Sequence, residues 1–173
     1  RVAKNSAVIK HLCAAAENGK DVTALVELRA RFDERNNIGW AKELEDAGCR
    51  VIYGVEGYKC HSKLCLITRR EKNGLSYVTQ VGTGNYNEKT SAIYTDFSLL
   101  TARQDIAEDA VAFFQNMLIG NLRGEYHKLL AAPVSLKATL LRLIDGEIAR
   151  GNRGHIILKV NSVTEQELME KLS

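Results

Sequence analysis

Apolar positions in the first half of the chain follow two spacings, one typical of helices and one typical of strands. Apolar residues that return every three or four positions predict helices over about 7–16, 37–47 and 105–119. Short apolar runs predict buried strands over 21–28 and 49–53. This helix–strand–helix–strand order with short connections is typical of an α/β layer with parallel strand pairing.

A second group of strands is predicted in the middle of the chain. Residues 57–68 form a pattern typical of a short turn that runs into a strand, and residues 76–81 are expected to return antiparallel. Asn73-Gly74 lies between them and favours a tight reversal. A further strand is expected over 93–100. The predicted fold class is therefore α/β, with a mixed sheet flanked by helices.

The pattern changes after about residue 120. A helix is predicted over 135–150, a strand over 155–160, and a last helix with Ser162 or Thr164 as its N-cap. One helix–strand–helix segment without a partner strand cannot complete a core. The chain starts without methionine and ends in a helical pattern, which favours a piece of a longer protein. We therefore expect three segments: a first domain over 1–120, a linker over 121–134, and the incomplete start of a second, similar domain over 135–173.

Composition sets broad limits on the class of protein. With 173 residues, 45% of them hydrophobic, the chain can bury one core. The net charge of +3 permits an anionic partner without requiring one. The four cysteines lack the arrangement of a secreted disulfide framework and indicate a reducing compartment. A metal site at Cys60, His61 and Cys65 is disfavoured because the two cysteines fall on opposite faces of the predicted strand.

The first candidate for chemistry is the pair His61 and Lys63. Side chains alternate along a strand, so both are expected to point the same way. A neutral imidazole beside an ammonium suits a negatively charged substrate, because the imidazole can attack phosphorus and the lysine can balance charge on phosphoryl oxygens. The alternative is a structural histidine beside a lysine whose charged end reaches solvent.

Three further groups are expected near one edge of the sheet. Arg29 and Arg31 suit bidentate binding of phosphate, although they could equally be a solvated surface pair. The turn 82–85 (Gly-Thr-Gly-Asn) could aim several N–H groups at an anion, or be an ordinary turn. Asp96, on the same predicted strand face as Tyr94, could orient an imidazole or accept a local hydrogen bond.

Taken together, six stretches carry a resemblance to one family. They are Val22–Glu34, Asn37–Ala41, Val51–Gly54, Lys59–Lys63, Gly82–Asn87 and Tyr94–Asp96. These stretches resemble the bacterial polyphosphate kinases that autophosphorylate on histidine, and the similarity covers nearly the whole chain. The resemblance implies a phospholipase-D-like fold. It also implies reversible transfer of the γ-phosphate of ATP to inorganic polyphosphate, with Mg²⁺.

The resemblance also implies roles for individual residues. His61 would be the phosphorylated nucleophile and Asp96 the carboxylate that supports it. Tyr94 would contact the nucleotide. Arg1 and Arg31 would belong to the phosphate and Mg²⁺ site, holding phosphates that carry the metal, because a guanidinium has no lone pair for a metal ion. The expected phosphate-binding set is completed by Lys63, which balances charge, and Asn85.

Two departures from the resemblance shape the expected function. Phospholipase-D enzymes carry His-x-Lys-x-x-x-x-Asp, whereas the fifth residue after Lys63 is Thr68. This favours the kinase over the hydrolases and moves the carboxylate role to Asp96. The family also uses a second histidine-bearing domain, which would lie beyond Ser173, so this piece is expected to be inactive alone.

The resemblance implies further partners and a location. Expected partners are inorganic polyphosphate, ATP or ADP, the remaining domains of the same enzyme and further copies of it, whereas nucleic acid is not expected. The expected location is the cytoplasm, with peripheral attachment to the inner face of the membrane left open. Two alternative functions remain, namely a phospholipase-D-type phosphodiesterase or nuclease, and a polyanion-binding module without catalysis.

Overall fold

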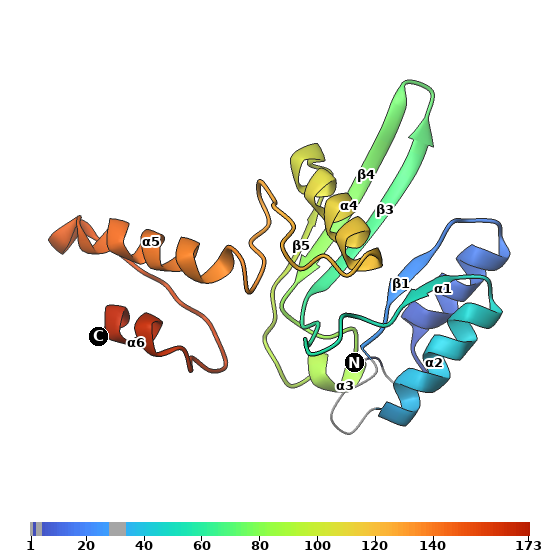
Figure 1. Ribbon diagram of the computed structural model, residues 1–173, viewed down its shortest axis with the longest axis horizontal. Helices are drawn as coiled ribbons and strands as arrows, with labels where there is room; N and C mark the ends of the chain where they lie inside the picture. The colour runs from blue at the N-terminus through green and yellow to red at the C-terminus, as the bar shows by residue number, and fades with distance from the viewer. Residues whose placement is uncertain (1, 3–4, 28–33) are drawn as a thin grey trace. The chain divides into compact units, whose positions relative to one another are not determined.

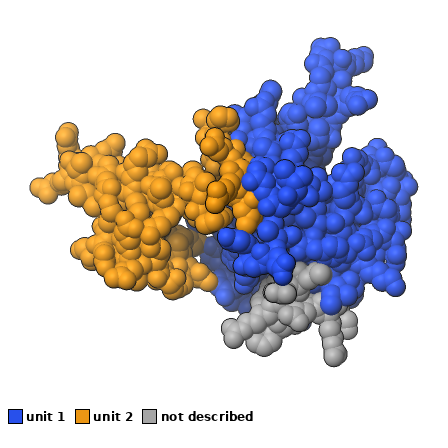
Figure 2. Space-filling model, viewed as in Figure 1, with its two compact units in different colours: residues 1–121 blue, residues 122–173 orange. Residues whose placement is uncertain are grey.

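The computed structural model of the chain describes residues 2, 5–27 and 34–173. It divides into two compact units, residues 1–121 and 122–173 (Figure 2). In unit 1 the elements follow in this order (Figure 1): α1 (Ala7–Glu17), β1 (Thr23–Leu25), α2 (Glu34–Asp46), β2 (Arg50–Ile52), β3 (Lys63–Glu71), β4 (Gly74–Gly82), α3 (Glu88–Ser91), β5 (Ser98–Thr101) and α4 (Gln104–Leu118). Unit 2 contains α5 (Leu136–Ile148), a short 3₁₀ helix (Gly151–Arg153) and α6 (Gln166–Leu172).

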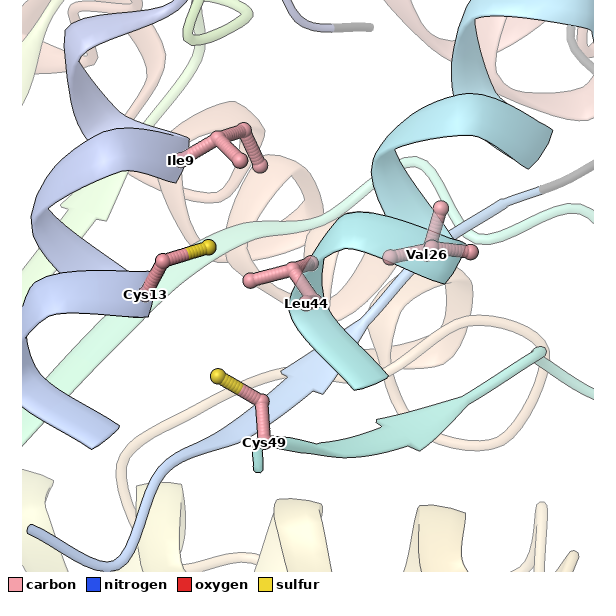
Figure 3. Close-up of a cluster of buried hydrophobic side chains, with 6 residues drawn as sticks. Ile9, Cys13, Val26, Leu44 and Cys49 are labelled. Carbon is pink, nitrogen blue, oxygen red and sulfur yellow. The ribbon is translucent and has the colours of Figure 1, made fainter. Parts of the chain in front are cut away.

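The first layer of unit 1 consists of β1 and β2 with helices α1 and α2. The two strands pair in parallel, as the sequence predicts, with Ala24 opposite Val51. Apolar side chains from both helices and from the strand ends meet in one core (Figure 3). Leu44 of α2 is completely buried there. The core holds Ile9, Cys13, Val26, Ala41, Leu44 and Cys49.

The second layer of unit 1 is an antiparallel sheet in the order β3-β4-β5. The β3–β4 hairpin is paired from Lys63 opposite Gly82 to Glu71 opposite Gly74. Helix α4 packs against β3 and β4 (Figure 1), and Thr79 of β4 is completely buried. Because side chains alternate along a strand, Gln80 and its paired residue Cys65 lie on the face opposite Thr79. Lys63, two residues before Cys65, shares that face.

Several strand boundaries differ from the sequence-based expectation. Hydrogen bonding places the strands in two sheets rather than one mixed sheet, although the α/β class itself is confirmed. In the turn and strand predicted over 57–68, the strand starts only at Lys63, so His61 precedes it instead of sharing a strand face with Lys63. The strand predicted over 93–100 is reduced to β5 at Ser98–Thr101. Tyr94 and Asp96 therefore lie on a loop and not on a strand face.

Unit 2 confirms one of its three predicted elements closely. Helix α5 is present, whereas residues 155–160 form no strand and are exposed. The segment offers backbone groups for pairing, but a strand requires a partner, and the structure describes none in this unit. The N-cap of α6 is Glu165, whose carboxylate accepts from the N–H of Leu168 at 2.8 Å, rather than Ser162 or Thr164.

Two further properties concern the helices and the cysteines. In the part of the chain that the structure describes, no helix has both the length and the apolar character needed to cross a bilayer. The four cysteines are free thiols. Burial raises the pKa of the Cys13, Cys49 and Cys65 thiols, which keeps these groups protonated.

Candidate active site

His61 and Lys63 meet directly, although they are not neighbours on one strand face. Lys63 is the first residue of β3 and only 7% exposed. Its side chain turns back toward the preceding segment, so that Nζ lies 3.1 Å from Nδ1 of His61. The same Nζ donates to the carbonyl oxygen of His61 at 2.6 Å. Together these two contacts fix the histidine's ring and its backbone around one ammonium.

This contact determines which nitrogen of the imidazole carries the proton. A lysine ammonium can only donate, so Nδ1 of His61 accepts and the ring proton belongs on Nε2. Removal from water lowers the pKa of His61, and the positive charges of Lys63 and Lys59 lower it further. The imidazole is therefore neutral near pH 7, with its lone pair on Nδ1 directed at Lys63.

The Asp96 carboxylate acts on Lys63 and is held by a threonine. Burial lowers the pKa of Lys63, and the nearby Cys60 and then the negative charge of Asp96 oppose that shift. The carboxylate Oδ1 of Asp96 accepts a hydrogen bond from the Thr83 hydroxyl at 2.8 Å. Among the described residues, the contact at Nδ1 of His61 comes from Lys63, so direct support of the imidazole by Asp96 stays a prediction.

The glycine-rich turn after β4 leaves room for the side chains of neighbouring residues. Neither Gly82 nor Gly84 has a left-handed backbone. A Cβ on Gly84 would lie 2.3 Å from Oδ2 of Asp96, and one on Gly82 would lie 2.6 Å from Nε2 of Gln80. The N–H of Thr83 donates to the carbonyl of Phe97 at 3.0 Å. The glycines thus admit neighbouring side chains, and at Thr83 the N–H is already occupied.

A second polar network lies on the Lys63 face of the sheet. The hydroxyl of Tyr86 donates to Oε1 of Gln80 at 2.5 Å, and Nε2 of Gln80 donates to Ser98 at 2.9 Å. Burial raises the pKa of Tyr86 to about 12, with a smaller contribution from Cys65. Tyr86 therefore stays a neutral donor, and the network ties the turn to β4 and β5.

Glu27 anchors the segment that leads to His61, a role that sequence reasoning missed. Its carboxylate accepts from the N–H of Cys60 at 3.0 Å. Its carbonyl oxygen accepts from the side chain of Asn37 at 2.6 Å. The available signal was its position: Glu27 follows β1 at the carboxyl edge of a parallel pair, where functional groups gather in α/β folds.

The remaining predicted site residues either make no hydrogen bond to the pair or lie outside the described residues. Among the described residues, neither Tyr94 nor Asn85 makes a hydrogen bond to His61 or Lys63; Tyr94 is exposed and Asn85 half-buried. The arginines at positions 1, 29 and 31 lie outside the described residues. Within the described ranges, no three His, Cys, Asp or Glu side chains group as a metal site.

Comparison of the sequence with protein families gives a match over most of the chain. Residues 1–122 match the family described as Polyphosphate kinase C-terminal domain 1. The chain is 49% identical to a polyphosphate kinase of Staphylococcus epidermidis and 46% identical to one of Halalkalibacterium halodurans, in both cases over 99% of its length. It spans only about a quarter of these curated relatives, 24% and 25% respectively.

A solved structure shows the same architecture. The chain is similar to the polyphosphate kinase crystal structure from Porphyromonas gingivalis, with a TM-score of 0.81 and 36% sequence identity. The similarity covers 99% of this chain and 29% of that one. The fold of these 173 residues is thus similar to the fold of one part of that longer chain.

Proposed function

Because this chain belongs to the polyphosphate kinase C-terminal domain 1 family, we propose that it supplies the phosphate-accepting histidine of a polyphosphate kinase. The reaction is reversible transfer of the γ-phosphate of ATP to inorganic polyphosphate through phosphohistidine at His61. One observation carries this proposal: a neutral imidazole is held by the ammonium of the buried Lys63. A nucleophile and a cation for phosphoryl oxygens are thereby combined at one point.

The geometry supports an exchange of hydrogen bonds before transfer. In the described arrangement the ammonium of Lys63 occupies the lone pair of Nδ1. Phosphoryl oxygens are charged acceptors and compete for the same ammonium. When Lys63 donates to the incoming phosphate, the imidazole is released. A ring nitrogen then forms the N–P bond as the P–O bond to ADP breaks, and ADP leaves with the electron pair.

The second half of the reaction returns the enzyme to its starting state. The terminal oxygen of a polyphosphate chain attacks the phosphorus of phosphohistidine, forming a P–O bond as the N–P bond breaks. The imidazole regains its lone pair, and Lys63 can return to it. We assign the neighbouring phosphate contacts to Arg1, Arg31 and Asn85 and the nucleotide contact to Tyr94, on the strength of the motif resemblance.

Mg²⁺ would enter with the nucleotide. The cation binds oxygen ligands, whereas the charged groups that surround His61 include Lys59 and Lys63. The described residues therefore do not fit a protein-built magnesium cage, and the metal belongs on the phosphate oxygens of ATP. We also propose that residues 135–173 begin a second, similar domain after a linker over 121–134, that further domains and copies complete the site, and that the enzyme is cytoplasmic.

The direct test is phosphate labelling of the full-length protein that contains this chain. With γ-labelled ATP, the wild type should acquire label that is lost in acid and stable in alkali, and mass spectrometry in alkali should place it on His61. His61→Ala should abolish the label, whereas His11→Ala, on the exposed side of α1, should retain it.

The same experiment separates the two alternative functions. Undiminished labelling of His61→Ala would reject the assigned nucleophile. A covalent phosphodiester adduct with DNA or lipid would indicate a phosphodiesterase instead. Salt-sensitive polyphosphate binding without any labelling of the wild type would indicate a polyanion-binding module. Running the isolated 173-residue chain in parallel tests whether transfer requires the remaining domains.

A further inference from the structure

We propose that Thr83 is a positioning residue for phosphoryl transfer, because its hydroxyl holds the Asp96 carboxylate, whose charge acts on Lys63. Gly84 completes the arrangement by leaving room for that carboxylate. This inference rests on the proposed function and adds to it two residues that contact no reacting atom. Thr83 and Gly84 belong to the turn after β4.

The hydrogen bonds of Thr83 fix the direction of its hydroxyl proton. The Oγ1 atom accepts from the N–H of Phe97 at 3.0 Å and lies 2.8 Å from Oδ1 of Asp96. A carboxylate oxygen accepts, so the hydroxyl must donate to Asp96. The N–H of Thr83 in turn donates to the carbonyl of Phe97 at 3.0 Å. One residue thus binds the backbone on one side of Asp96 and the side chain of Asp96 itself.

Gly84 also positions Asp96, because the absence of a side chain leaves room for the carboxylate. A Cβ at this position would lie 2.3, 2.6 and 3.0 Å from Oδ2, Cγ and Cβ of Asp96. Rotation of the Asp96 side chain would move Oδ2 and Cγ away, but the contact at its Cβ would still require a small shift of the residue. A side chain at Gly84 must therefore move the Asp96 carboxylate from its place.

Displacement of Asp96 changes the pKa of Lys63. Burial lowers the pKa of this lysine and the charge of Lys59 adds to the shift, whereas Cys60 and then Asp96 act against it. If Asp96 moves away, the pKa of Lys63 falls further, and the ammonium loses its proton at a lower pH. Neutral lysine cannot stabilise phosphoryl oxygens. The loss of activity on the basic side of the pH profile should therefore begin at lower pH.

The first experiment measures the initial rate of His61 phosphorylation against pH in the full-length protein. Thr83→Val keeps the shape and removes the hydroxyl; we expect a roughly tenfold slower rate near neutral pH, from a lost hydrogen bond to a charged group, and a basic limb shifted to lower pH. Thr83→Ser should restore both. Thr79→Val makes the same replacement on β4, at a hydroxyl without a partner among the described residues, and should change neither.

A second variant keeps the experiment decisive if Thr83→Val folds poorly. Gly84→Ala retains the hydroxyl but displaces Asp96, and should show the same slower rate and shifted limb. Gly146→Ala, in a helix with open space around the glycine, is the matched control. A wild-type profile in both Thr83→Val and Gly84→Ala, or a lower melting temperature with an unmoved basic limb, would overturn the inference. Failure of the wild type to label would instead reject the proposed function.

Discussion

Lys63 is the residue on which both His61 and Asp96 act. It donates to the ring and to the backbone of His61, and it receives the charge of Asp96. The histidine and the lysine were recognisable from the sequence because they are two residues apart. The hydrogen bond from Thr83 to Asp96 was not recognisable from the sequence. The two residues are thirteen positions apart and meet only because β4 and β5 pair.

At this scale the titration of His61 can be predicted. Removal from water lowers its pKa below the ordinary 6.5, followed by the charges of Lys63 and Lys59. Lys63→Met removes one of these charges and should raise the pKa of His61. NMR titration of the His61 ring checks this, with Lys20→Met, which removes the same charge at the exposed end of α1, as control. An unchanged pKa in Lys63→Met would contradict the described contact.

The lowered pKa of His61 also makes the unfolding free energy depend on pH. Between the folded pKa and 6.5, folded His61 binds fewer protons than unfolded His61 does, so the unfolding free energy rises with pH in that window. As pH falls through it, the contribution is lost. Chemical denaturation at several pH values should therefore show a pH dependence below 6.5 that weakens in Lys63→Met.

Elements with a long apolar periodicity were predictable from the sequence, whereas elements whose formation depends on hydrogen-bonding partners were not. Helices α1, α4 and α5 match their predicted ranges within two residues, because an apolar face repeated over several turns has few alternative structures. Residues 93–97 of the predicted strand form a loop, where the N–H of Phe97 bonds to a threonine side chain instead of a strand. Residues 155–160 have a strand pattern and no described partner strand.

The first layer should depend strongly on one side chain of α2. Leu44 is 0% exposed, whereas Ile38 of the same helix is 58% exposed. Leu44→Ala should lower the unfolding free energy by about 2–5 kcal/mol through lost burial and a cavity. Ile38→Ala should cost much less. Urea denaturation of the two variants measures the difference, and equal losses would contradict the described core.

The whole molecule contains two units that differ in how much they bury. Within the described residues, the buried hydrophobic side chains of unit 2 reduce to Ile144, whereas unit 1 has a core of several residues in each layer. Helices α5 and α6 are joined by exposed ion pairs, including Lys137 with Glu165 and Glu167. Exposed pairs of this kind contribute little and weaken with salt.

This difference predicts unequal local stability. Backbone amides of α5 and α6 should exchange with deuterium faster than those of α1 and α2, because local opening is less costly where little apolar surface is buried. Hydrogen–deuterium exchange read by mass spectrometry on the 173-residue chain tests this, and added salt should increase the contrast. Equal protection in both units would mean that unit 2 is stabilised by more than its own core.

The β3–β4 register makes the site sensitive to the number of residues in the two strands of this hairpin. Lys63 is the last paired residue of a hairpin whose turn is Lys72-Asn73. A slip of one residue would turn Lys63 to the opposite face of the sheet. Insertion or deletion of one residue within β3 or β4 should therefore damage the site as much as replacing Lys63. An insertion at the Lys72-Asn73 turn should be tolerated.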